Sequence, residues 1–249
     1  MLKKYKNWIG FFLAVYLGML GIYYIFSLNI PANTFFLQVR RYIPCALSVT
    51  IATCLWCKYN SKQALVTHTI LALVWSSLYP FLFYLSYAAS INLIDHNKDL
   101  VFASYSYASL VLLHLLLSKR LGTKIAAGII SFLQIIVAVV PILEIWYYFT
   151  YKSVFTVPAA LAILQTTPNE AKEYIMMFLG YKGIVGTIAG ILVLYFLLFR
   201  QNKKASDASI PLSLKLQITS LVIILAAGGF TLTHFHQTGA ANIFVETMK

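Results

Sequence analysis

Long apolar stretches, separated by short polar or basic segments, make up most of this 249-residue sequence. Several approach the ~20 residues that a helix needs to cross a bilayer. Only 10% of the residues are charged, whereas a soluble domain carries about 25%. Because a backbone in lipid must satisfy its own hydrogen bonds, these stretches are expected to be helices. The sequence therefore predicts an all-α fold, a polytopic membrane helix bundle.

The bundle is predicted to have about seven membrane spans, with about five as the lower limit. The shortest, 43–57, can cross only if flanking side chains such as Arg40 and Arg41 extend to the interface. The first is longer than the apolar region of a cleaved signal peptide, so we expect it to be retained. The predicted spans are 8–28, 43–57, 64–87, 100–117, 125–148, 181–199 and 216–233, and the longer connectors include 29–42, 88–99 and 200–215.

The basic residues are unevenly distributed among the segments that join these spans. If the N-terminus is inside, 12 of the 19 lysines and arginines lie in inner segments. The positive-inside rule therefore predicts a cytoplasmic N-terminus, and seven spans then place the C-terminus on the opposite side. The net charge of +12 is spread over short clusters between apolar runs, so it does not indicate nucleic-acid binding.

A polar stretch at 163–175 interrupts the apolar runs and is built to begin a helix. Thr167 suits the N-cap, Pro168 the first helical position and Glu170 the third, which is the capping-box pattern. The residues that follow alternate between apolar and charged at helical spacing. This pattern predicts a short amphipathic helix at the membrane surface, within an interfacial segment at 156–179. Glu170 and Glu173 would suit a cationic head group there, and free N–H groups at the helix start would suit a phosphate.

Other polar residues in the apolar runs have both a functional and a structural interpretation. Glu144 is an intramembrane acid, which is by default a functional-site hypothesis. It lies about one turn from the interface, however, so an ordinary solvated or hydrogen-bonded glutamate is an equal alternative. His68 and His114 each stand alone in a span and are interpreted as hydrogen-bonded histidines of the bundle.

The candidate metal ligands are incomplete. His234 and His236 lack a nearby third ligand, and Cys54-x-x-Cys57 lacks the second pair that would complete a site. Together with Cys45, these cysteines are interpreted as small, buried apolar residues. The sequence therefore predicts no metal site.

Gln165-Thr-Thr-Pro-Asn-Glu-Ala-Lys-Glu-Tyr174 resembles the Q/E-T-x-x-x-E-A-x-E-[YF] signature of bacterial phosphoethanolamine transferases. These inner-membrane enzymes modify lipid A or the lipopolysaccharide core. The resemblance is specific over about 160–180 and loose elsewhere, although the tail 241–249 is similar to the segment that leads into the family's soluble domain. It implies a multi-pass protein of the bacterial inner membrane, with the capped helix and the C-terminus in the periplasm.

The resemblance also implies a mechanism for a complete enzyme. A periplasmic domain of the alkaline-phosphatase and sulfatase type holds zinc and a threonine nucleophile, which takes phosphoethanolamine from phosphatidylethanolamine and passes it to a lipid-linked sugar. The membrane motif helps to bind the donor head group, and it matches Gln165, Thr166 and Glu170 here. An asparagine found four residues before that threonine in some members is Ala162 in this chain. The family's membrane domain has five spans, fewer than predicted here.

Residues 1–249 are thus expected to form one transmembrane domain, with the zinc and the nucleophile in a soluble domain beyond them. We expect no catalytic residue, metal or cofactor in this chain, and no transfer by the chain alone. Its expected partners are phosphatidylethanolamine and a lipid A or core acceptor. Two alternatives stay open: a small-molecule transporter, which needs a continuous polar path, and a structural anchor in which Thr166 and Glu170 only cap a helix.

Overall fold

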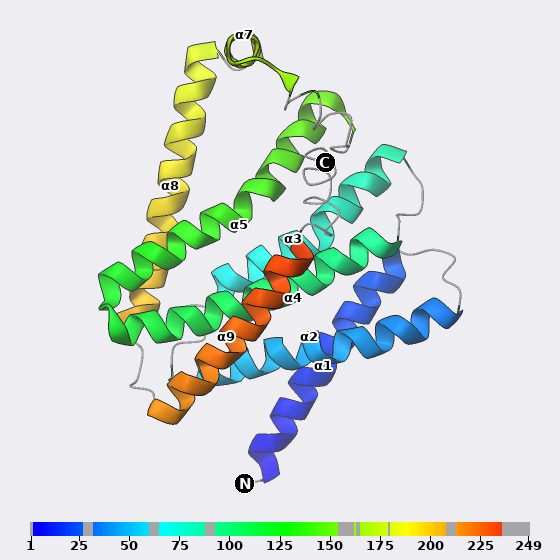
Figure 1. Ribbon diagram of the computed structural model, residues 1–249, viewed down its shortest axis with the longest axis vertical. Helices are drawn as coiled ribbons and strands as arrows, with labels where there is room; N and C mark the ends of the chain where they lie inside the picture. The colour runs from blue at the N-terminus through cyan, green and yellow to red at the C-terminus, as the bar shows by residue number, and fades with distance from the viewer. Residues whose placement is uncertain are drawn as a thin grey trace.

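The protein is described by a computed structural model that covers residues 2–26, 32–59, 65–87, 93–153, 162, 165–178, 180–207 and 213–235. In these ranges the elements are all helices, as the sequence predicts, with no strand. Figure 1 shows them in chain order: α1 (Leu2–Phe26), α2 (Ala32–Tyr59), α3 (Leu65–Tyr87), α4 (Leu93–Arg120), α5 (Thr123–Tyr151), α7 (Pro168–Phe178), α8 (Gly180–Asp207) and α9 (Leu214–Phe235).

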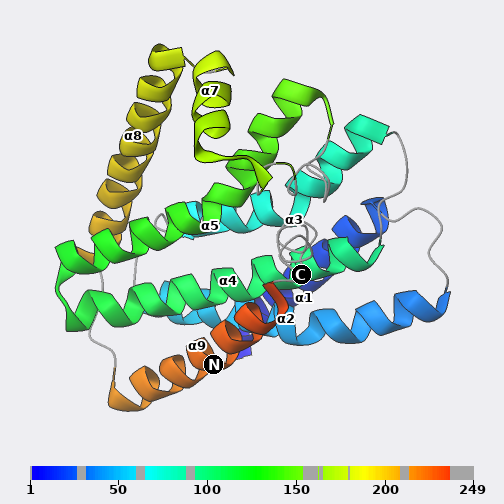
Figure 2. The same cartoon turned by 45° about the horizontal axis from the view of Figure 1, so that its top comes forward.

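Helix α4 is the centre of the bundle. It packs against α2, α3, α5 and α9 and touches α1 and α8. In the most apolar stretch of α4, 61% of the residues are buried, whereas no residue is buried in the most apolar stretch of α8. Small residues such as Ala103, Ser104 and Ala108 are buried along α4, and such residues let membrane helices approach closely. Helices α1 and α8 lie at the periphery (Figures 1 and 2).

Among the described residues, five helices are long and apolar enough to cross a membrane, through Asn7–Ile25, Leu65–Leu82, Asp99–Ser118, Thr123–Tyr151 and Gly180–Asp207. Large apolar side chains such as Leu17, Phe132 and Phe196 are exposed on these helices. A soluble protein rarely exposes so much apolar surface, whereas a lipid-facing surface does. The described structure is therefore consistent with a multi-pass membrane protein. Helices α2 and α9 correspond to the two other predicted spans, and the count of seven and the orientation stay predictions.

The predicted connectors are partly wrong, because helices continue into all three. Helix α2 begins at Ala32 rather than near Ile43, α4 begins at Leu93, and α8 runs on to Asp207. These extensions contain neither proline nor glycine. Hydropathy indicates where an apolar run ends. The helical hydrogen bonding of the backbone can continue past that point, through polar residues, because proline and glycine are the residues that interrupt it. One consequence is that Asp99, expected in a polar loop, is a buried residue of α4.

Interhelical hydrogen bonds supplement the apolar packing. The indole N–H of Trp75 in α3 donates to the carbonyl of Val137 in α5 at 2.7 Å. The hydroxyls of Thr53 in α2 and Tyr107 in α4 lie 2.9 Å apart. Polar groups in lipid have no water to bond, so such pairs satisfy them while joining neighbouring helices.

Candidate functional site

The predicted capping box is present at the start of α7. The backbone N–H and the hydroxyl of Thr167 both donate to Oε2 of Glu170, at 2.8 and 2.9 Å. In return, the N–H of Glu170 lies 3.4 Å from the hydroxyl oxygen of Thr167. These donors, the backbone N–H first, hold the pKa of Glu170 below its usual range because they stabilise the carboxylate. Glu170 is therefore an anion at neutral pH.

The three predicted head-group residues lie on or beside this cap. Gln165 and Glu170 are exposed, and Thr166 is half-buried. The hydroxyl of Thr166 donates to the carbonyl of Ala162 at 2.6 Å, so it is already engaged as a donor. Within the described part of the chain, Oε1 of Glu170 accepts no hydrogen bond. One anionic oxygen is thus held at the surface and open to a ligand.

The phosphate-binding capacity of this helix start is smaller than predicted. A helix leaves its first four N–H groups without intrahelical partners. Here Thr167 and Glu170 satisfy each other's N–H, and Pro168 has none. Only the N–H of Asn169 remains. The site therefore favours a cation at Glu170 over an anion at the helix start.

Helix α7 packs against α8, at the end of the molecule where α5 also terminates (Figure 1). In both views, the start of α5 lies close to the end of α8, and the two helices diverge from there toward α7 (Figures 1 and 2). The half of α8 next to α7 is largely exposed, from Tyr181 to Val193. Residues 156–161, 163–164 and 179 of the predicted interfacial segment lie outside the described residues.

A buried polar cluster occupies the other end of α5 and α8. The imidazoles of His68 in α3 and His114 in α4 lie 3.3 Å apart, Nε2 to Nδ1. His68 Nδ1 lies 3.1 Å from the amide nitrogen of Gln134 in α5. His114 Nε2 lies 3.0 Å from the hydroxyl of Ser206 in α8. The two histidines are hydrogen-bonded, as expected, but they are partners rather than solitary residues.

Asn202 in α8 joins this cluster to α5. Its side-chain N–H groups donate to Oε1 of Gln134 at 2.8 Å and to the hydroxyl of Ser131 at 2.9 Å. With its oxygen so engaged, Gln134 presents its N–H to His68. With neutral imidazoles, His68 then donates to His114, and His114 donates to Ser206, so these three hydrogen bonds run in one direction from Gln134 to Ser206.

The cluster joins α3, α4, α5 and α8 at one level of the bundle. The ring of Trp56 from α2 packs on His114, with centroids 4.9 Å apart, and on His68 at 5.9 Å. No group of three or more histidine, cysteine, aspartate or glutamate side chains that could hold a metal ion occurs in the described ranges. The hydrogen bonds of the cluster run sideways between helices and form no polar path across the bundle.

Glu144 is buried, with 5% of its surface exposed, so the solvated interpretation is wrong. Its Oε1 has no hydrogen-bond partner in the portion of the chain that the structure describes. Among the cysteines, Cys45 is buried as expected, whereas Cys54 and Cys57 are only half-buried. His236, one of the two candidate ligands near the C-terminus, lies outside the described residues.

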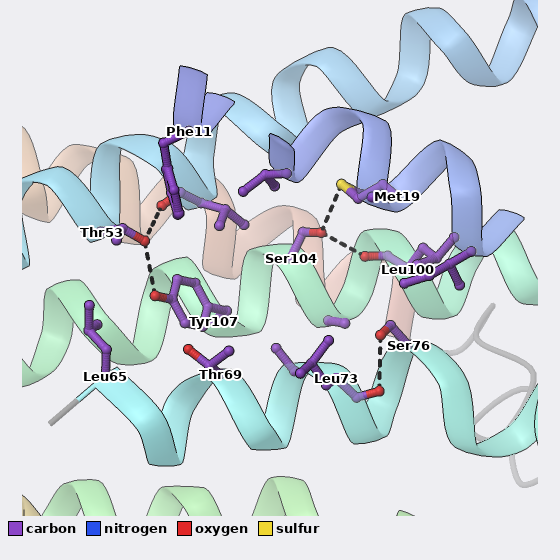
Figure 3. Close-up of a pocket in the computed structure, with 16 residues that line it drawn as sticks. Phe11, Met19, Thr53, Leu65, Thr69, Leu73, Ser76, Leu100, Ser104 and Tyr107 are labelled. Atoms are coloured by element: carbon purple, nitrogen blue, oxygen red, sulfur yellow. Dashed lines mark hydrogen bonds between the residues drawn. The ribbon is translucent and has the colours of Figure 1, made fainter. Parts of the chain in front are cut away.

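An apolar cavity of about 410 Å³ lies between α1, α2, α3 and α4 (Figure 3). Its hydroxyl groups bond to the protein: Thr53 to Tyr107, Ser104 to the carbonyl of Leu100 and Ser76 to that of Leu73. Its apolar walls offer water few partners, so the space suits an apolar occupant.

Comparison with known proteins adds no relative: no protein family matches the chain, and no curated protein or solved structure does.

Proposed function

We propose that this chain is the membrane domain of a phosphoethanolamine transferase and that it binds the head group of the donor lipid, phosphatidylethanolamine. The observation that carries the proposal is the carboxylate of Glu170. The capping box fixes it at the start of α7, and it is exposed there with one oxygen open. The motif 165–174 supplies the family resemblance.

The geometry suits the ammonium of the head group more than its phosphate. An ammonium has three N–H donors and a positive charge, and Oε1 of Glu170 is a free anionic acceptor. The exposed amide of Gln165 and the remaining N–H of Asn169 are the groups left to meet the phosphate. Thr166 acts mainly through its bond to Ala162, which shapes the turn before the cap.

In this proposal α7 lies in the periplasmic interface of the inner membrane, and the spans anchor the enzyme. The bond-forming chemistry belongs to a zinc-containing domain outside these residues, which transfers phosphoethanolamine to lipid A or to the lipopolysaccharide core. The divergence of α5 and α8 toward α7 supports the proposal, since it leaves the apolar face of α8 open to lipid beside the head-group residues (Figure 2).

The test separates the charge of Glu170 from its capping role. Glutamine also serves at the third position of a capping box, so Glu170→Gln keeps the cap and removes the charge. Glu173, the other acid that the sequence offered to a cationic head group, is exposed on the same helix but is not held by the cap, so Glu173→Gln is the matched control. Binding of a short-chain, fluorescent phosphatidylethanolamine is measured for each variant in detergent micelles, with the phosphatidylcholine analogue as the reference lipid.

An exposed ion pair is screened by water and changes affinity by at most roughly fivefold. We expect Glu170→Gln to weaken binding of phosphatidylethanolamine by about that factor and to leave phosphatidylcholine, whose quaternary ammonium cannot donate a hydrogen bond, much less affected. Glu173→Gln should bind like the wild type. Equal binding of both lipids by the wild type, or equal losses in the two variants, would contradict the proposal.

A further inference from the structure

The cavity among the first four helices has the properties of a hydrocarbon site. Its walls are largely aliphatic and aromatic, and the hydroxyls of Thr53, Ser76 and Ser104 are used within the protein (Figure 3). No charged side chain lines it. A polar ligand would find few partners, whereas a hydrocarbon chain needs none.

The cavity is open to the lipid-facing surface. Phe11 and Gly18 of α1 and Leu73 of α3 line it and are themselves exposed. They lie on the two helices that flank it on that side, and α1 and α3 contact each other only slightly. A hydrocarbon chain can therefore enter the cavity sideways from the bilayer, between α1 and α3.

The width of the cavity indicates whether a single hydrocarbon chain or a protein helix could occupy it. On α1 the lining extends from Phe11 to Ile22 and on α3 from Leu65 to Ser76, each a rise of about 16 Å. Spread over that length, 410 Å³ corresponds to a mean cross-section of about 25 Å² for the centre of a water molecule, or about 55 Å² once its radius of about 1.4 Å is added on all sides. A helix 10–12 Å across needs about 80–110 Å². The cavity is thus a narrow slot, too thin for a partner helix.

We propose that this slot binds one acyl chain of a membrane phospholipid, which inserts between α1 and α3 and reaches Ser104 and Tyr107 of α4. The lipid acts there as a structural component that fills the space between α1 and the rest of the bundle. This site does not involve the head-group residues of α7, so it holds or fails independently of the proposed function.

The chain offers a matched pair of variants to test this. Gly18 lines the slot and a Cβ added there meets no atom within 4 Å, so Gly18→Leu adds bulk at the wall of the slot where there is open space. A Cβ at Gly10 likewise meets nothing, but Gly10 is an exposed residue of α1 outside the lining. Gly10→Leu is therefore the control for the same chemical change on the same helix. Ala72→Leu fills the slot from α3 and serves if Gly18→Leu fails to fold.

The protein is placed in nanodiscs of phosphatidylethanolamine and phosphatidylglycerol that contain a phosphatidylcholine with a diazirine in the middle of one acyl chain. After irradiation, the labelled residues are mapped by mass spectrometry. We expect label on Met19 and Tyr107, which are buried in the wall, as well as on the exposed Leu17. The label on Met19 and Tyr107 should be lost in Gly18→Leu and in Ala72→Leu and kept in Gly10→Leu.

Label confined to outward-facing residues, or label on Met19 and Tyr107 that persists in both filled variants, would overturn the proposal. A parallel sample with a photoreactive polyprenol tests the source of the hydrocarbon. Label from the polyprenol at Met19 and Tyr107, with none there from the phospholipid, would also overturn it.

Discussion

Replacing Asn202 by leucine tests whether the buried polar cluster holds α5 and α8 together. Asn202 donates to Gln134 and Ser131, at 2.8 and 2.9 Å. Interhelical hydrogen bonds in membranes contribute about 0.6 kcal/mol on average and about 1.7 kcal/mol at most, so the two bonds are worth about 1–3 kcal/mol. Leucine also removes the side-chain oxygen of Asn202, which has no partner in the described ranges, so we expect a loss toward the lower end.

The assay is reversible unfolding by sodium dodecyl sulfate in mixed micelles, followed by tryptophan fluorescence. A double-mutant cycle with Gln134→Leu isolates the shared bond, with an expected coupling of about 0.6–1.7 kcal/mol. The control cycle pairs Asn202→Leu with Thr187→Val. Thr187 lies about 22 Å along the same helix and bonds only within it, so these effects should add. A coupling with Gln134 no larger than the control value would refute the role of the cluster.

Three further outcomes are expected. Trp75→Phe removes the 2.7 Å bond to Val137 and keeps an aromatic ring, so it should lower the free energy of unfolding in the same titration by about 0.6–1.7 kcal/mol. The pKa of Glu170 is lowered in the folded protein, so its stabilising contribution is complete above the unfolded value near 4.5 and is lost as the pH falls through the lower folded value. Protection from hydrogen exchange at the start of α7, taken relative to the intrinsic rate at each pH, should therefore fall only in acid below about pH 4.5, and Glu170→Gln should abolish that pH step. In a cysteine-free background, a membrane-impermeant maleimide should label Glu173→Cys on intact spheroplasts and Lys204→Cys only after lysis, and the reverse pattern would refute the predicted orientation.

The features that could be predicted from the sequence are those set by neighbouring residues. Hydropathy predicts membrane-length helices because crossing lipid requires an unbroken apolar run. The cap at Thr167 could be predicted because its partner, Glu170, is three residues away on the same turn. Helix ends were predicted less well: Asp99 and Asn202 lie in helices that continue past their apolar runs.

The buried cluster could not be predicted, because its partners are far apart in the chain. His68 and His114 are separated by 46 residues, and His114 and Ser206 by 92. Their pairing depends on the order and rotation of four helices, which hydropathy does not determine. One signal was available: Asn202 and Ser206 are polar, one turn apart, and so lie on the same face of a helix. A polar face so close to lipid needs partners on a neighbouring helix.

Gly180 lies at the junction between α7 and α8, at the end of α8 that is farthest from the buried polar cluster. Gly180 starts α8 with φ of +58°, a conformation that other residues rarely adopt, and it follows α7 after a single residue. The polar cluster fastens α8 near Asn202, about 33 Å away along the helix axis. If α8 tilts about Asn202, a tilt of about 5° displaces its α7 end by roughly 3 Å. A force that displaces α7 would therefore be felt by the hydrogen bonds at the opposite end of α8.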